Sequence, residues 1–455
     1  MLAILLIAVI IVIVWVLKDI VTTFPKSKTD KNTFISTVEI DSINALAAQL
    51  VNKFIAYDLP FEKKNNLLQS VNNSLQHLQK NNNNKVLYLL QKLDLDAALN
   101  YLIESVEDEE ESREVAKIWV DIGNLQQLKS SQLALYAYKK ASQFDDQNSN
   151  AWNRLGHLYR QQKQFGLAEN AYSRVLKSSG DDITAKAIAL ANFALLYQMQ
   201  GKLDKAEEFY LKALKINEMR DNRVSLASNN ENLAIIYKKK NKFELSEKHY
   251  LLAFSYYEGL KQNNSIASIQ SSLASLYYQY QDFDKAKQYY QKALEIYKKN
   301  RNQTKIASSY SNLGILKQQQ GQADKAKEFF DKSLRIYQKI DQQQGVADQH
   351  SHLGVLNRLQ KKFTQSESSH LKSLQIYRQL QHLDGVSQQQ TNLGFLYQIW
   401  NQTEKACRYW QQSKQTLMKV HNENRIQRLG ILLKKHCKNK EIDNEERANT
   451  LDDDS

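Results

Sequence analysis

A constant period of 40 residues runs through the second half of this chain. Six small residues, each an alanine or a serine, recur at that spacing without drift. They are Ala206, Ser246, Ala286, Ala326, Ser366 and Ala406. Self-similarity at such a period is typical of repeat architectures, in which each repeat buries its apolar face only by stacking on its neighbours.

Other positions repeat in step with these small residues. Twelve residues upstream of five of them, a leucine is followed by an alanine or a glycine. Helices pack about 8–10 Å apart where small side chains lie at the crossing and larger ones fill the adjacent holes. The pattern therefore predicts pairs of packed helices. Four residues after each small residue comes a ring: Tyr210, Tyr250, Tyr290, Phe330, His370 and Trp410.

The turn residues of the chain agree with an all-helical fold. Only two prolines and thirteen glycines occur in 455 residues. A sheet-rich protein of this length would need many more residues of these types to build its turns. We therefore expect the all-α class.

The repeat resembles the tetratricopeptide repeat (TPR), which has a Leu-Gly or Leu-Ala pair in its first helix and Ala-x3-aromatic-x2-Ala in its second. Residues 151–175 carry a near-complete match, through Trp152, Leu155, Gly156 and Ala168 among others. The resemblance covers about residues 85–420 and implies a right-handed α-solenoid of about eight repeats plus a degenerate first one. The later repeats carry about six extra residues and lack the usual closing proline, as in kinesin light chains and cell-polarity adaptors. Both bind peptides, so the resemblance implies a peptide- or protein-binding scaffold.

The N-terminal segment predicts a membrane anchor. Residues 2–17 are uninterruptedly apolar and would span about 24 Å as a helix. With Lys18 snorkelling, residues 1–21 are long enough for a single transmembrane helix. A cleaved signal peptide is the alternative, but neither a preceding basic region nor a small-residue cleavage site is present. The lysines that follow the anchor favour a C-terminal body facing the cytoplasm.

The remaining segments complete the expected domain organisation. Residues 22–84 read as a juxtamembrane helical stalk or cap, 421–440 as a C-terminal capping helix, and 441–455 as a disordered acidic tail. The two cysteines, Cys407 and Cys437, form no metal-binding spacing. We interpret them as incidental thiols of a reducing compartment.

The chain lacks sequence signatures of catalysis. It has no glycine-rich phosphate loop, no GxSxG elbow, no HExxH motif and no zinc spacing. We therefore expect no catalytic residue, no metal site and no cofactor. The net charge of +13 is spread as scattered lysines and no nucleic-acid motif accompanies it, so nucleic acid is not an expected partner.

The first helix of each repeat predicts a binding surface. At about 100° per residue, the face opposite the packed stripe carries the residue before the leucine and the second and sixth residues after it. Asparagine recurs at the first of these positions, where its amide could hold an extended backbone. The alternative is that these asparagines pair with neighbouring helices. The expected partner-binding residues are Asn192, Asn232, Asn312, Asn392, Ile235, Ile315, Phe395, Lys239 and Gln319.

Three functions fit these observations. The first is a membrane-anchored scaffold that presents its groove to a peptide or protein partner, which is similar to bacterial envelope-assembly scaffolds. The second is a ligand-responsive regulator whose solenoid controls a separate signalling enzyme. The third is a secreted or periplasmic repeat protein.

Overall fold

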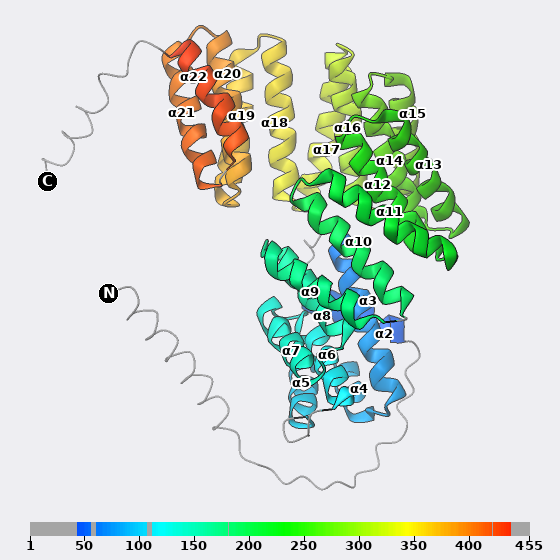
Figure 1. The fold of residues 1–455 in the computed structure, drawn as a ribbon. Coiled ribbons are helices and arrows are strands. Elements are labelled where there is room, and N and C mark those ends of the chain that lie inside the picture. Colours follow the sequence, from blue (N-terminus) through cyan, green and yellow to red (C-terminus); the bar gives the residue numbers. More distant parts are fainter. Residues whose placement is uncertain (1–42, 56–60, 107–111, 181, 421, 438–455) are drawn as a thin grey trace, which may run out of the picture. The chain divides into compact units, whose positions relative to one another are not determined.

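The computed structural model describes residues 43–55, 61–106, 112–180, 182–420 and 422–437. Every helix or strand assigned within these ranges is an α-helix (Figure 1). The predicted all-α class is therefore confirmed. The chain divides into two compact units at Gly180, which are described separately.

Unit 1 packs eight described helices around one continuous apolar core. Its last four helices form two packed pairs, α6 with α7 and α8 with α9. Hydrogen bonds from α6 to α3 join the longest helix to this pairwise array. The helices are α2 (Ile43–Phe54), α3 (Phe61–Lys80), α4 (Asn84–Gln91), α5 (Leu95–Glu104), α6 (Arg113–Gln126), α7 (Ser131–Phe144), α8 (Ser149–Gln161) and α9 (Phe165–Ser178).

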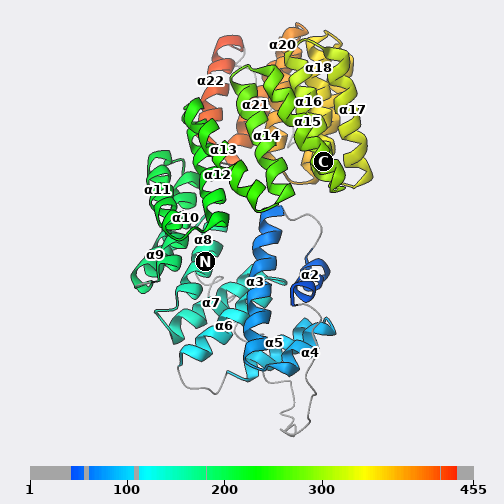
Figure 2. The ribbon, with the colours of Figure 1, turned by 90° about the vertical axis from the view of Figure 1, so that its right-hand side faces the viewer.

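Unit 2 contains twelve successive helices of 17 residues each, followed by one of 14. Consecutive helices pack on one another in chain order (Figure 1, Figure 2). The helices are α10 (Ile183–Met199), α11 (Leu203–Met219), α12 (Arg223–Lys239), α13 (Phe243–Gly259), α14 (Asn263–Gln279), α15 (Phe283–Lys299), α16 (Gln303–Gln319), α17 (Ala323–Lys339), α18 (Gln343–Leu359), α19 (Phe363–Gln379), α20 (Leu383–Ile399), α21 (Thr403–Lys419) and α22 (Glu423–His436).

The connections in unit 2 are three-residue turns that need no proline. After α14, the Gln281 N–H donates to the Tyr278 carbonyl at 3.1 Å and the Asp282 N–H donates to the Tyr277 carbonyl at 2.9 Å. These two bonds are the Schellman pattern, which satisfies the last carbonyls of a helix. Gln281 has φ +63°. A left-handed residue recurs every 20 residues: Gly201, Asp221, Asn241, Lys261, Gln281, Arg301, Gly321, Asp341, Lys361, Gln381 and Asn401.

The small residues of the repeat lie where paired helices cross. Ala286 and Ala326 have no exposed surface. Where the residue is a serine, its hydroxyl donates to a carbonyl of the preceding helix: Ser246 Oγ to Ala234 O at 2.8 Å and Ser366 Oγ to Gly354 O at 2.7 Å. A buried hydroxyl is thus satisfied at a contact that has no room for a larger side chain.

The structure corrects the expected membrane localisation. No helix of the described ranges is both long enough and apolar enough to cross a membrane. This finding contradicts the expectation of a single-pass membrane protein whose body faces the cytoplasm. That expectation depended on residues 1–21, which lie outside the described ranges.

The interpretation of the cysteines was also wrong. Cys407 in α21 and Cys437, directly after α22, form a disulfide with their Cα atoms 5.9 Å apart. The two residues are 30 positions apart in sequence, so only the return of α22 along α21 brings them together. Leu429 of α22 is buried in the same contact region as the last repeat.

Candidate functional site

The candidate site lies on the first helices of the repeats in unit 2. We call α10, α12, α14, α16, α18 and α20 the A helices. Three positions of each A helix, counted from the repeat leucine (phenylalanine in α10), form what we call the A-helix face. They are the residue directly before the leucine, the fifth residue before it and the second residue after it. Most of these side chains are half-buried, so the face is neither core nor open surface.

The predicted asparagines do not form a uniform ladder on this face. Asn192, Asn232 and Asn312 are half-buried, whereas Asn392 is buried. The Asn232 amide donates to the Ser228 carbonyl at 3.0 Å within its own helix. The Asn392 side chain accepts from Gln388 at 3.3 Å, also within one helix. Among these four positions, Asn312 is the one that borders a pocket.

The other predicted residues divide between core and solvent. Ile235, Ile315 and Phe395 are half-buried and pack against the apolar core. The Phe395 ring meets the Trp410 indole edge-on, with centroids 5.6 Å apart. Lys239 and Gln319 are exposed at the ends of their helices. The apolar residues therefore contribute more to packing than the sequence prediction assumed.

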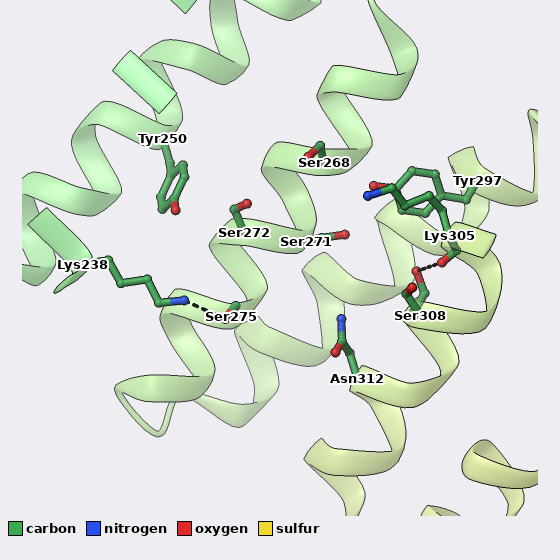
Figure 3. A pocket seen from close by; sticks show the side chains of 11 residues that line it. Lys238, Tyr250, Ser268, Ser271, Ser272, Ser275, Tyr297, Lys305, Ser308 and Asn312 are labelled. Atoms are coloured by element: carbon green, nitrogen blue, oxygen red, sulfur yellow. Dashed lines mark hydrogen bonds between the residues drawn. The ribbon is translucent and has the colours of Figure 1, made fainter. Parts of the chain in front are cut away.

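A pocket of about 270 Å³ opens on the A-helix face at α14. Figure 3 shows Lys238 and Lys305 approaching from opposite sides of α14, with Asn312 pointing toward the space between them. Every residue that lines the pocket is polar or a tyrosine. They are Lys238, Tyr250, Ser268, Ser271, Ser272, Ser275, Tyr297, Lys305, Ser308, Ser309 and Asn312.

The pocket exists because α14 carries unusually small residues. Before its leucine, α14 has Ser272 where α12 and α16 have asparagine. Two residues after the leucine, it has Ser275 where both neighbours have isoleucine. A serine replaces a larger side chain at both positions, and the packed helices around it do not close the space.

Hydrogen bonds hold the walls of the pocket. Lys238 Nζ donates to Ser275 Oγ at 2.7 Å. Ser309 Oγ donates to the Lys305 carbonyl at 2.8 Å, and the Ser308 and Tyr337 hydroxyls are 2.9 Å apart. Burial lowers the pKa of Lys238, which shows that its ammonium group is partly removed from water.

The electrostatic balance of the pocket is positive. No carboxylate is among its lining residues. The charge of Glu231 acts on two lining residues, Tyr250 and Tyr297, and its carboxylate accepts a hydrogen bond from the Tyr257 hydroxyl at 3.1 Å. Burial raises the pKa of Tyr250 to about 12, and the charge of Glu231 adds to that shift.

A metal or general-base site does not emerge from the described ranges. Within them, no group of three or more His, Cys, Asp or Glu side chains could hold a metal ion. His370 occupies the ring position of its repeat, against Gly354. Burial lowers the pKa of His370 to about 4, so this imidazole is neutral at pH 7 and serves as a core ring.

The sequence prediction missed most of the pocket. It named Asn312 as a binding residue, but not Lys238, Lys305 or Tyr297. The signal was present in the aligned repeats, because α14 is the one A helix of unit 2 with serine both before and two after the leucine. A serine that leaves a gap between helices is visible only once the helices are placed.

The comparisons with known proteins agree with the fold. Residues 154–353 match the family model described as the MalT-like TPR region. None of the curated proteins matches the chain. A solved signal transduction ATPase with numerous domains (STAND), with a tetratricopeptide repeat sensor, from Pyrococcus horikoshii, has a TM-score of 0.53 at 14% identity. That match covers 88% of this chain and 68% of the other.

Two further solved structures resemble parts of the chain. BtubC (BKLC) from P. vanneervenii is 26% identical with a TM-score of 0.41, covering 46% of this chain and 88% of the other. The apo form of RapI is 16% identical with a TM-score of 0.48, covering 58% of this chain and 98% of the other. The family model matches the middle of the chain, and the STAND structure shares its helical-repeat fold.

Proposed function

We propose that this TPR-type chain is a binding scaffold that holds a segment of a protein partner on the A-helix face of unit 2. The observation that carries the proposal is the polar pocket at α14, which opens on the A-helix face of the repeat array. Pockets with a few convergent polar groups are where proteins bind ligands.

The residues around the pocket suit an extended backbone. The Asn312 amide points into the pocket (Figure 3), and an amide can both donate to and accept from a peptide group. Asn192 and Asn232 hold equivalent positions two repeats and one repeat before the α14 repeat, and Asn392 does so three repeats after it. Lys239 and Gln319 are exposed beside the same face, where they would contact the partner's side chains.

The long helices also support a peptide-binding role. The helices of the 40-residue repeats are 17 residues long. A longer A helix offers more side chains to a partner that lies across the array.

The experiment is affinity capture with the full chain, followed by binding measurements on variants. The double variant Asn232→Ala/Asn312→Ala should weaken binding of the captured partner, since each lost hydrogen bond costs about 0.5–1.5 kcal/mol. Asn300→Ala is the matched control, because Asn300 is exposed in the turn after α15. Equal affinities of the double variant, the control and the wild type would contradict the proposal.

A ligand-responsive regulator is the second candidate, favoured by the match of residues 154–353 to the MalT-like TPR region. In this function, ligand binding would change the curvature of the repeats and so control a separate enzyme. Small-angle scattering with and without the captured partner tests it. An unchanged scattering curve in the saturated complex would contradict regulation through curvature, while leaving the scaffold intact.

A further inference from the structure

The pocket at α14 presents two ammonium groups without counter-ions. Lys238 comes from α12 and Lys305 from α16, on opposite sides of the α14 serines (Figure 3). Across the described part of the chain, neither lysine forms an ion pair. Both side chains are half-buried. A partly desolvated cation without a partner favours an anionic ligand.

The rest of the pocket offers hydrogen-bond donors. The Ser268 hydroxyl and the Asn312 amide line the pocket, together with the Ser271 and Ser272 hydroxyls, which hydrogen-bond Tyr297 and Tyr250. No aliphatic side chain contributes to the lining. At about 270 Å³, the pocket is smaller than the cavities that hold whole drug-sized ligands. It therefore suits one small polar group of a longer partner.

We propose that this pocket binds the phosphate group of a phosphorylated side chain in the partner segment, with Lys238 and Lys305 as its counter-ions. The inference rests on the proposed scaffold function and names the group that is recognised. A phosphate monoester carries a charge of about −1.5 to −2 at pH 7 and three acceptor oxygens. That charge matches two lysines, and the oxygens can accept hydrogen bonds from donors of the lining.

A carboxylate fits the same pocket less well. It brings one negative charge and two oxygens, which would leave one of the two lysines without a counter-ion. Glu231 lies near the edge of the pocket and accepts from the Tyr257 hydroxyl at 3.1 Å. Its charge opposes any anion at that edge, but the two lysines of the lining leave a net positive charge around the pocket.

The neighbouring repeats explain why the site occurs once along this stretch of the face. Ile235 and Ile315 replace Ser275 at the equivalent positions of α12 and α16. The variant Ser275→Ile therefore places in α14 a side chain that the adjoining repeats already accommodate. It should fill the pocket and remove the oxygen that receives the Lys238 hydrogen bond, while the helix pair remains folded.

The test uses the full chain and three fluorescent peptides of five residues. Each has alanine at four positions and a central phosphoserine, serine or glutamate. We expect the phosphoserine peptide to bind at least about tenfold more tightly than the other two, as charge-assisted hydrogen bonds predict. Lys238→Gln and Ser275→Ile should each remove that preference. Lys299→Gln, an exposed lysine of α15, removes the same charge away from the pocket and should preserve it.

Four outcomes would overturn the inference. The serine peptide binding as tightly as the phosphoserine peptide would exclude phosphate recognition, and equal binding of the glutamate peptide would assign the pocket to carboxylates. Unchanged binding by a folded Lys238→Gln variant would place the phosphate elsewhere. Inorganic phosphate that binds as tightly as the phosphopeptide would show a free-phosphate site instead of a peptide site.

A phosphatase arm separates this inference from the scaffold proposal. The partner captured from cells is treated with phosphatase and its affinity is measured again. A partner that binds equally after treatment, yet loses affinity for Asn232→Ala/Asn312→Ala, would contradict phosphate recognition and support the scaffold. A phosphopeptide that binds through Lys238, with a captured partner indifferent to Asn232→Ala, a position outside the pocket lining, would support phosphate recognition and contradict the scaffold.

Discussion

The indole of Trp410 lies against the backbone of Gly394, so that a Cβ atom added to Gly394 would be 2.3 Å from the Cδ1 and Nε1 atoms of the ring. Trp410 is fully buried, which leaves the ring no free space to move into. The same relationship joins Gly314 to the Phe330 ring. The close approach of a ring to a helix backbone is therefore how these helix pairs are held together.

Replacing Gly394 with alanine should destabilise the protein. The added methyl group overpacks the contact with Trp410, which typically costs about 1–3 kcal/mol. Urea unfolding of Gly394→Ala measures the loss. The control is Gly430→Ala in α22, where an added Cβ meets nothing within 4 Å and alanine's higher helix propensity should stabilise by up to about 1 kcal/mol. If both variants shift in the same direction, the ring contact is not what requires glycine at position 394.

The left-handed turn residues are a place where stability can be gained. Lys361 has φ +58°, a conformation that costs a non-glycine residue about 1–2 kcal/mol. Lys361→Gly should therefore raise the free energy of unfolding by up to about 1 kcal/mol, after the extra entropy of glycine in the unfolded chain is subtracted.

The reverse substitution, made at the equivalent position of another turn, serves as the control. Gly321 has φ +73° and open space around its Cα, so Gly321→Ala introduces backbone strain without a steric clash. It should lower the thermal midpoint while Lys361→Gly raises it. A midpoint that stays unchanged in Gly321→Ala and does not rise in Lys361→Gly would mean that the turns tolerate left-handed side chains at no cost.

Unit 1 should lose stability as the pH rises above about 6.5, the ordinary pKa of histidine. His77 Nδ1 lies 2.5 Å from Asp121 Oδ2, and Glu114 is 3.9 Å from Nε2. The hydrogen bond to Asp121 raises the pKa of His77 despite its partial burial. A raised folded pKa gives stability that is fully present below the unfolded value of about 6.5 and is lost as the pH rises through the folded value.

The measurement is the melting temperature between pH 6 and pH 8.5 for the wild type and His77→Gln. We expect a steeper decline in the wild type over this window. The buried histidines of unit 2 have lowered pKa values and titrate in the opposite sense at lower pH, so they contribute equally to both proteins. Parallel curves would show that the His77–Asp121 pair does not stabilise unit 1.

Reduction of the Cys407–Cys437 disulfide should loosen the C-terminal end of unit 2. For a cross-link between residues 30 positions apart, the chain-entropy model gives about 3–4 kcal/mol of stabilisation. Because a repeat contacts only its neighbours, the loss should be confined to α21 and α22. Hydrogen exchange of these helices with and without dithiothreitol measures it. The Cys407→Ser/Cys437→Ser variant should be insensitive to reductant, and equal protection in the reduced and oxidised wild type would contradict the prediction.

The repeat could be predicted from the sequence because its packing requires particular residue types at fixed positions. Ala286 and Gly314 have to be small wherever two helices cross, so their spacing records the packing directly. The disulfide was not readable, since the proximity of Cys407 and Cys437 depends on the path of α22. The pocket could not be predicted either, because it forms where the small side chain of Ser275 leaves a space between packed helices. The asparagines also differ from the predicted ladder. The side chains of Asn232 and Asn392 form hydrogen bonds within their own helices, which the spacing of the residues does not show.

Because the same turn recurs every 20 residues, a whole 40-residue repeat can be added to the array or removed from it. Deleting residues 262–301 would join Lys261, a left-handed turn residue, to Asn302, which caps the next helix. The new junction would reproduce the turn that it replaces. Unequal recombination between such segments could therefore lengthen or shorten the protein without disturbing a single helix end. A deletion of this segment would also remove the α14 serines, so a descendant could keep its architecture and lose its pocket in one genetic event.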